Sequence, residues 1–300
     1  MELPQHMDLI NKTIIKDLLK RHGAKPEKYL GQHFILSKKA LAQMIAAAEI
    51  KKNDTIVEIG PGLGTLTQEL AKTNTKIIAI EKDPAMIAIL KETLADYKNV
   101  KIIQADAHKI GVGHLFLSKY KYKIVANLPY NVATFLIRQW LDPPPSPRLR
   151  RARPELMVLM IQKEVAQRMT AKPPKMNLLA VSVQFYADVK IIDYVPAEAF
   201  WPRPKVDSAI IKIVPKKKQP QKTRRAFFAA VKAGFSQPRK QLIGNLTRKL
   251  SARGGSASGG NIPKEKLLGI FENLNISERA RAENLSLEQW ILLAKEIENN

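Results

Sequence analysis

Four consecutive residues, Asn127-Leu128-Pro129-Tyr130, carry the groups needed to hold a planar amine. They follow an apolar run that predicts a buried strand, so they lie where that strand ends. The side-chain oxygen of Asn127 and the backbone carbonyl of Leu128 can each accept a hydrogen from the N6 amine of adenine. Pro129 stiffens the turn, and the ring of Tyr130 offers a stacking face. The tetrad therefore predicts a site that presents an adenine amine to an electrophilic carbon; the alternative is a turn whose tyrosine packs in the core.

A glycine-rich turn follows an earlier strand-like run, in the order Glu58-x-Gly60-x-Gly62-x-Gly64. Glycines have no Cβ, so a ligand can approach the backbone and the amides that open the next helix. Glu81 ends the next apolar run, 21 residues after Gly60. An acid at about that distance binds ribose hydroxyls in Rossmann-type sheets. Turn and acid together predict a site for a nucleoside cofactor.

The spacing of these glycines differs from the G-x-G-x-x-G pattern of dinucleotide sites and favours S-adenosylmethionine, which has no pyrophosphate. It leaves a dehydrogenase open until the Asn127 tetrad is considered. Asp106, followed by Ala107, ends a third strand-like run. An acid at that edge can accept a hydrogen bond from the cofactor's adenine amine, or can simply cap the following turn.

Short Ile/Val-rich runs alternate with amphipathic stretches between about residues 37 and 214, which predicts a doubly wound α/β sheet of the Rossmann-like kind. Strands are expected at Thr55–Gly60, Lys76–Glu81, Val100–Asp106, Lys123–Leu128, Leu156–Ile161, Val181–Tyr186 and Ser208–Val214. Helices are expected between them at Leu63–Lys72, Pro84–Tyr97 and Asn131–Leu141. After a linker at Lys216–Pro220, four further helices are expected at Arg224–Phe235, Pro238–Leu250, Lys264–Leu274 and Ser286–Glu298.

The charge of the chain favours an anionic partner. Its 300 residues hold 50 Lys and Arg against 27 Asp and Glu, a formal net charge of +23. Between Trp201 and Arg253 there are fifteen basic residues and one acid, Asp207. A solvated helical face usually mixes signs, so this stretch predicts a nucleic-acid footprint, with an anionic membrane surface as the weaker alternative.

Other classes of site receive no support. The chain has no cysteine, and its five histidines form no cluster with ligand spacing, so we expect no metal. No apolar run is long enough to span a bilayer, and no secretory signal is evident. We expect a cytoplasmic monomer that binds no membrane.

Several motifs in the same order are similar to those of the ribosomal RNA adenine N6-dimethyltransferase family, and most closely to its small-subunit branch (KsgA type). They are the Asn127 tetrad together with Gly31–Phe34, Gln162–Ala166, Phe200–Ser208, Phe235–Lys240 and Arg281–Ser286. The resemblance extends from about Tyr29 to Leu293. It implies N6-dimethylation of two adjacent adenines in the hairpin near the 3′ end of small-subunit (16S) rRNA, on the pre-30S subunit, with S-adenosylmethionine as donor.

The predicted linker and the helical pattern after it divide the chain into two domains, and the resemblance implies their roles and the site residues. Residues 1–219 would form the methyltransferase domain, with 1–30 as an N-terminal extension, and 220–300 a helical rRNA-binding domain. Tyr130 and Phe200 would stack on the adenine beside Asn127, Leu128 and Pro129. The cofactor would be held by Gln32, His33, Ile35, Glu58, Gly60, Gly62, Gly64, Glu81, Asp106, Ala107 and Asn127. The RNA would be held by Arg203, Lys205, Lys216, Lys217, Lys218, Arg224, Arg225, Arg239, Lys240, Arg248 and Lys249.

The chain departs from this branch at His33, where asparagine is usual, and in two inserted segments at 142–154 and 251–260. Two other functions stay open at this point. One is methylation of large-subunit (23S) rRNA by an Erm-type enzyme, which shares the fold and most motifs. The other is a non-catalytic rRNA-binding assembly factor, which could have lost the glycines or Asn127, although both are present here.

Overall fold

The computed structural model describes residues 7–27, 31–107, 109, 121–142, 153–217, 220–251 and 262–299. The chain divides into two compact units. Unit 1 comprises Met1–Ala166 and Val189–Pro215, and unit 2 comprises Gln167–Asp188 and Lys216–Asn300. Unit 2 thus takes in Gln167–Asp188 as well as the expected helical region, because the Phe185 ring stacks on Phe227 with centroids 4.0 Å apart. No helix within the described residues is long and apolar enough to cross a membrane.

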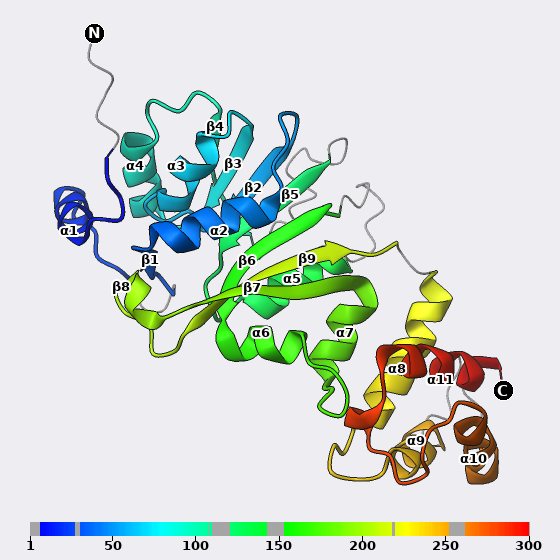
Figure 1. Cartoon of the computed structure of the whole chain (residues 1–300). Helices are drawn as coiled ribbons and strands as arrows, with labels where there is room; N and C mark the ends of the chain where they lie inside the picture. The colour runs from blue at the N-terminus through cyan, green and yellow to red at the C-terminus, as the bar shows by residue number, and fades with distance from the viewer. Residues whose placement is uncertain are drawn as a thin grey trace. The chain divides into compact units, whose positions relative to one another are not determined.

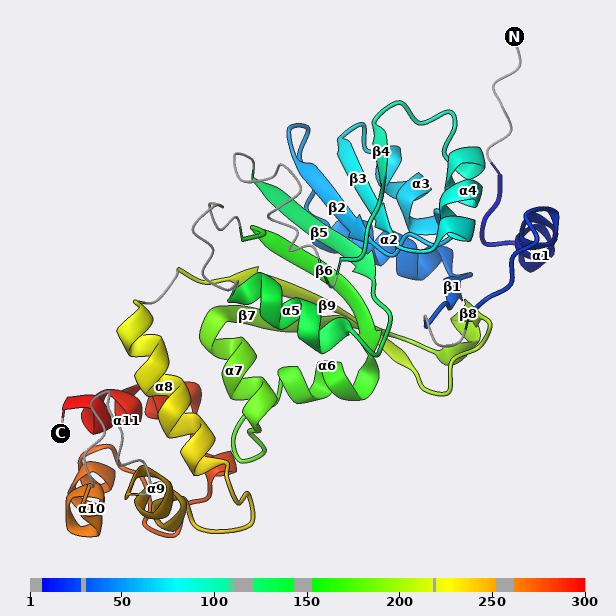
Figure 2. The ribbon, with the colours of Figure 1, turned by 180° about the vertical axis from the view of Figure 1, so that it is seen from behind.

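A seven-stranded sheet forms the centre of unit 1 (Figures 1 and 2). Its strand order is β4-β3-β2-β5-β6-β9-β7. The strands are β2 (Thr55–Ile59), β3 (Lys76–Glu81), β4 (Val100–Gln104), β5 (Tyr122–Asn127), β6 (Leu156–Gln162), β7 (Ala187–Val195) and β9 (Ser208–Pro215). Neighbours from β4 to β6 run parallel, whereas β9 runs antiparallel to β6. The expected Rossmann-like fold class is confirmed.

Helices cover both faces of this sheet. The central strands are therefore nearly continuous runs of apolar residues. In Figure 1, α2 crosses the front of the sheet, and α5 lies on the opposite face, which Figure 2 brings forward. The helices in this part of the chain are α2 (Lys38–Ala48), α3 (Thr65–Ala71), α4 (Pro84–Thr93), α5 (Ala133–Leu141) and α6 (Lys163–Met169). Asp83 caps α4 through its side chain, and Pro84 occupies the first turn as expected.

The expected strand at Val181–Tyr186 is wrong. The segment belongs to helix α7 (Leu178–Tyr186), and the strand β7 begins directly after it. The side chain of Asn177 accepts a hydrogen bond from the backbone N–H of Ala180 and caps the helix. Because α7 is apolar on nearly all sides, its sequence has no helical periodicity that separates it from a buried strand.

The N-terminal segment of unit 1 adds a helix and a short ribbon beside the main sheet. Helix α1 (Lys12–Arg21) is capped by Asn11, and strand β1 (Phe34–Ile35) pairs antiparallel with β8 (Phe200–Trp201). The apolar face of α1 is buried in a cluster whose members include Phe34, Leu63 and Met86. This cluster joins the N-terminal segment to the glycine turn and to α4.

Within the described residues after the linker, unit 2 contains four α-helices, as expected: α8 (Gln221–Gly234), α9 (Leu242–Ser251), α10 (Lys264–Asn273) and α11 (Leu287–Asn299). The expected capping box is confirmed, because Ser286 and Gln289 bond each other's backbone N–H groups at 3.0 and 3.2 Å. The buried Asn245 donates to the carbonyls of Gly234 and Gln237, which ties α9 to the end of α8.

Gly234 is expected to be essential for the stability of unit 2. A Cβ at this position would lie 2.3 Å from the buried Trp290 ring and 2.7 Å from Leu242. We expect Gly234→Ala to lower the free energy of unfolding by about 1–3 kcal/mol, despite alanine's better helix propensity. Gly269→Ala in α10 is the matched control, because nothing lies within 4 Å of its added Cβ. Urea unfolding checks both; equal stability of the two variants would contradict the packing at Trp290.

Candidate cofactor and substrate site

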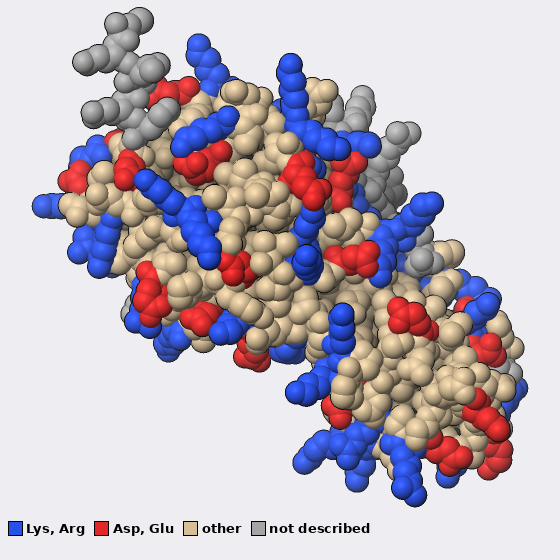
Figure 3. Space-filling model, in the orientation of Figure 1, with Lys and Arg blue, Asp and Glu red and all other residues tan. Residues whose placement is uncertain are grey.

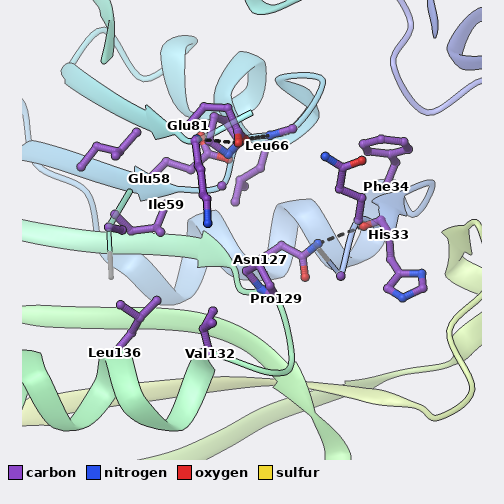
Figure 4. A pocket seen from close by; sticks show the side chains of 18 of the residues that line it. His33, Phe34, Glu58, Ile59, Leu66, Glu81, Asn127, Pro129, Val132 and Leu136 are labelled. Carbon is purple, nitrogen blue, oxygen red and sulfur yellow. Dashed lines mark hydrogen bonds between the residues drawn. The ribbon is translucent and has the colours of Figure 1, made fainter. Parts of the chain in front are cut away.

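A cavity of 370 Å³ opens at the carboxyl ends of β2, β3 and β5. Figure 4 shows side chains from the strand ends, α5 and the β1 segment converging on it. The predicted residues that line it are Gln32, His33, Ile35, Glu58, Gly60, Gly62, Glu81, Asp106, Ala107, Asn127 and Pro129. This volume suits a nucleoside-sized ligand. The structure thus brings nearly all of the predicted cofactor residues to one cavity.

The glycine turn leaves the floor of this cavity open. Gly60 and Gly62 have φ values of 66° and 58°, which favour glycine. A Cβ on Gly62 would lie 3.2 Å from the ring of Phe34, so even alanine would crowd the site. Gly64 does not line the cavity; its Cβ would meet Leu90 and Thr93 at 3.2 Å, so this glycine serves the packing of α4. The open floor fits a ligand that approaches the backbone.

The two buried acids in the cavity differ in their hydrogen bonds. Oε2 of Glu58 accepts from the Thr67 hydroxyl at 2.7 Å. Burial raises the pKa of Glu58 to about 8, although the Thr67 bond lowers it. Burial also raises the pKa of Glu81, against the effect of three backbone N–H groups that bond its carboxylate. These donors belong to Gly62, Lys82 and Asp83, so Glu81 joins the glycine turn to the loop after β3.

The far wall of the cavity is formed by Asp106 and its neighbours. Oδ2 of Asp106 forms an ion pair with Nζ of Lys82 at 3.2 Å. The backbone N–H of Ala105 bonds the carbonyl of Glu81, which holds the two strand ends together. On the N-terminal side, Gln32 donates to Asp83 at 2.8 Å. Gln32 therefore anchors the segment before β1 to the start of α4.

Asn127 is oriented by a hydrogen bond to the backbone. Its Nδ2 lies 3.2 Å from the carbonyl oxygen of His33. A carbonyl can only accept, so the amide nitrogen must be the donor, which turns Oδ1 the other way (Figure 4). Among the described residues, no donor bonds this Oδ1. The side chain thus presents a fixed, open acceptor at the end of β5, as the predicted role requires.

The ring of Tyr130 is held at the same turn. Its hydroxyl lies 2.6 Å from Oγ of Ser208, and its ring stacks on His33 with centroids 5.9 Å apart. Nδ1 of His33 lies 2.6 Å from the carbonyl oxygen of Pro202, so the imidazole donates there. Figure 4 shows this ring turned away from Asn127. His33 therefore connects the Asn127 turn to the loop after β8.

Phe200 does not reach the cavity in this conformation. It is 3% exposed and packs in the core with Ile35, Val195 and Ile210. Its register partner in the β1–β8 ribbon is Ile35, which turns the ring inward. Stacking of Phe200 on an adenine stays a prediction and requires the segment around β8 to move.

Comparison with known proteins places this site in a family. The model of the family described as ribosomal RNA adenine dimethylase matches residues 23–299. The chain belongs to this family. It is accordingly an S-adenosylmethionine-dependent methyltransferase that acts on ribosomal RNA, as the motifs predicted.

Individual relatives and solved structures cover most of the chain. Ribosomal RNA small subunit methyltransferase A of Dehalococcoides mccartyi is 38% identical over 280 residues, which are 93% of this chain and 90% of the relative. The crystal structure of a dimethyladenosine transferase from Plasmodium falciparum has a TM-score of 0.69 at 27% identity, covering 87% of this chain and 96% of that one. The 23S rRNA methyltransferase ErmE has a TM-score of 0.70 at 21% identity, covering 88% and 99%, and shares the fold.

The predicted RNA-binding residues of unit 1 are exposed. Arg203 forms an ion pair with Glu198 at 2.5 Å, and Lys205 follows in the same loop. Among those of unit 2, Lys216 bonds Asp188 and the carbonyl of Gln184. Lys218 lies outside the described residues, and Arg224 is half-buried. The exposed ones are Lys217, Arg225, Arg239, Lys240, Arg248 and Lys249.

Several cavity residues were not predicted from the sequence. They are Gly31, Phe34, Ile59, Pro61, Thr65, Leu66, Ile80, Lys82, Ala105, Asn131, Val132 and Leu136. Most are apolar, and an apolar residue at a strand end looks like core until the sheet order is known. Lys82 had a usable signal, because it directly follows Glu81 at the expected strand end.

Proposed function

We propose that this chain dimethylates N6 of two adjacent adenines in the 3′-terminal hairpin of small-subunit rRNA, acting in the cytoplasm on an assembling subunit. The observation that carries the proposal is the anchored amide of Asn127. Its nitrogen is held by the His33 carbonyl, and its oxygen, which no donor of the described residues bonds, lies at the edge of the cavity. This arrangement offers an acceptor for an amine rather than a charged base.

The residues at the Asn127 turn would prepare the amine for reaction. The lone pair of N6 is delocalised into the purine ring, so the nitrogen is a poor nucleophile. Oδ1 of Asn127 and the carbonyl of Leu128 would accept its two hydrogens and favour a pyramidal nitrogen. Tyr130, fixed by Ser208 and His33, would stack on the base. The gain in rate would come from orientation and fixed dipoles.

The cavity would hold the methyl donor beside this amine. S-adenosylmethionine, when bound, supplies an electrophilic methyl group. Glu81 and Asp106 would accept hydrogen bonds from its ribose and its adenine, and the turn at Gly60 and Gly62 gives it room. The predicted role of His33 at the methionine end is not supported by its ring, which donates to Pro202.

Sequence identity to a small-subunit methyltransferase over nearly the full chain favours the small-subunit substrate. The relative from Dehalococcoides mccartyi, which is named for the small subunit, supports this choice at 38% identity. The sequence identity to ErmE is 21%, so this likeness concerns the fold alone. The direct test incubates the protein and labelled S-adenosylmethionine with small and large subunits from cells that lack the protein. Label in small-subunit adenines supports the proposal, and label confined to large subunits would refute it.

Exposed basic residues of unit 2 are expected to bind the RNA backbone. We expect Arg239→Gln combined with Lys240→Gln to weaken binding of small subunits several-fold. The slope of log binding constant against log KCl concentration should become shallower by about one to two, because fewer counterions are released. Lys264→Gln with Lys266→Gln removes equal charge from α10, where Glu265 lies between the two lysines. Filter binding across a series of KCl concentrations measures both; equal losses in the two variants would show a general charge effect only.

A further inference from the structure

Helix α1 precedes the part of the chain that matches the family, which begins at residue 23. It nevertheless packs directly against the rest of unit 1, which carries the cavity and is called the catalytic unit below. Ile15 and Leu18 are fully buried in the cluster that contains Phe34, whose ring lies against the glycine turn. The hydroxyl of Thr65, a cavity residue, bonds the backbone carbonyl of Leu9 at 3.4 Å. The helix is thus a fixed part of the wall behind the cavity.

The outward face of α1 carries three exposed lysines. Lys12, Lys16 and Lys20 recur every fourth residue and are exposed. Among the described residues, no carboxylate lies within ion-pair distance of any of them. The neighbouring Arg21 is instead paired with Asp17 and Glu92. Like charges at this spacing weaken an isolated helix, and only Lys20, in the last turn, is favoured by the helix dipole, so helix stability does not explain Lys12 and Lys16.

This lysine face borders the loop that follows β8. Nζ of Lys16 lies 6.0 Å from the centre of the Trp201 ring, which is half-buried. Trp201 precedes Pro202, whose carbonyl holds the His33 ring that stacks on Tyr130. The exposed Arg203 and Lys205 continue the same loop. In Figure 3, Lys and Arg side chains project from the left edge, where Figure 1 places α1.

We propose that Lys12, Lys16 and Lys20 bind backbone phosphates of the substrate RNA next to the target adenine, on the catalytic unit itself. The inference rests on the proposed function and adds a second contact surface to the basic residues of unit 2. The apolar face of α1 is buried, so the helix has nothing to insert into a lipid surface. The combination of exposed cations and a neighbouring aromatic ring suits a nucleic-acid strand.

The test compares two triple variants that lose equal charge. Lys12→Gln, Lys16→Gln and Lys20→Gln are combined in one; Lys52→Gln, Lys98→Gln and Lys101→Gln, exposed around the amino ends of β2 and β4, are combined in the other. Binding of small subunits from cells that lack the protein is measured over a range of KCl concentrations. We expect the α1 variant to bind about tenfold more weakly. The slope of its log binding constant against log KCl concentration should be shallower by about two. Its affinity for S-adenosylmethionine should be unchanged.

Three outcomes would overturn the inference. The α1 variant could match the control variant in subunit binding. It could lose affinity for S-adenosylmethionine in proportion to activity, which would make α1 a support of the cavity. It could instead lose binding to vesicles of phosphatidylglycerol while subunit binding persists. Methylation by the unaltered protein in the same assay separates the two proposals, because its absence would count against the proposed function itself.

Discussion

Asn127→Ala is expected to reduce the rate constant for methyl transfer by at least about a hundredfold, while affinity for S-adenosylmethionine changes by less than about threefold. Loss of one fixed polar group in a transition-state site commonly costs this much. The side chain's anchor to the His33 carbonyl shows that its orientation is set before a base arrives. Single-turnover methylation of small subunits measures the rate constant, and calorimetry measures the affinity.

Two further variants sharpen this test. Asn127→Asp keeps an acceptor but cannot donate to the His33 carbonyl, so we expect it to lose orientation and most activity as well. Asn53→Ala makes the same truncation at an exposed turn before β2 that does not line the cavity, and it should remain active. Normal turnover by Asn127→Ala would remove the residue from its catalytic role, whatever the behaviour of the other two.

The second large effect is expected at Glu81. Its buried carboxylate accepts from the backbone N–H groups of Gly62, Lys82 and Asp83. Alanine would remove both the ribose acceptor and the tie that holds the glycine turn. We expect Glu81→Ala to weaken S-adenosylmethionine binding by about ten- to a hundredfold, equivalent to about 1.4–2.8 kcal/mol. Calorimetric titration with the cofactor measures this change.

The control for Glu81 is Glu69→Ala. Glu69 lies on α3, where its carboxylate pairs with Lys72 outside the cavity. It should leave cofactor affinity unchanged, since an exposed pair of this kind contributes little. Equal affinity of Glu81→Ala and the unaltered protein would reject the ribose assignment and leave Glu81 as a structural residue of the turn.

The catalytic strand ends were predictable because each one combines an apolar run with a polar residue after it. Glu81 and Asn127 met this description, and parallel strands bring such ends to one edge. Glu58, within β2, was found through the glycine spacing that follows it. Gly64 belongs to the same glycine spacing but serves the packing of α4, which only the position of that helix reveals. The helix Leu178–Tyr186 was mistaken for a strand because a fully buried helix and a buried strand share the same composition.

Contacts between segments far apart in the chain could not be predicted from the sequence. His33 and Pro202 are 169 residues apart, and nothing in either motif indicates that one bonds the other. The inward position of Phe200 likewise depends on its pairing with Ile35 in a two-residue strand, which is too short to leave a pattern. The role of α1 was also hidden, because only its packing against Phe34 and Leu63 places its lysines beside the catalytic unit.

Everything proposed for this chain depends on an adenine amine of small-subunit rRNA receiving its methyl groups at Asn127. The most direct measurement is mass spectrometry of that rRNA from cells lacking the protein, complemented with either the unaltered chain or Asn127→Ala. We predict N6,N6-dimethyladenosine at two adjacent positions with the unaltered chain and neither with the variant. Full dimethylation in cells that carry only the variant, or in cells that carry no copy, would contradict the account.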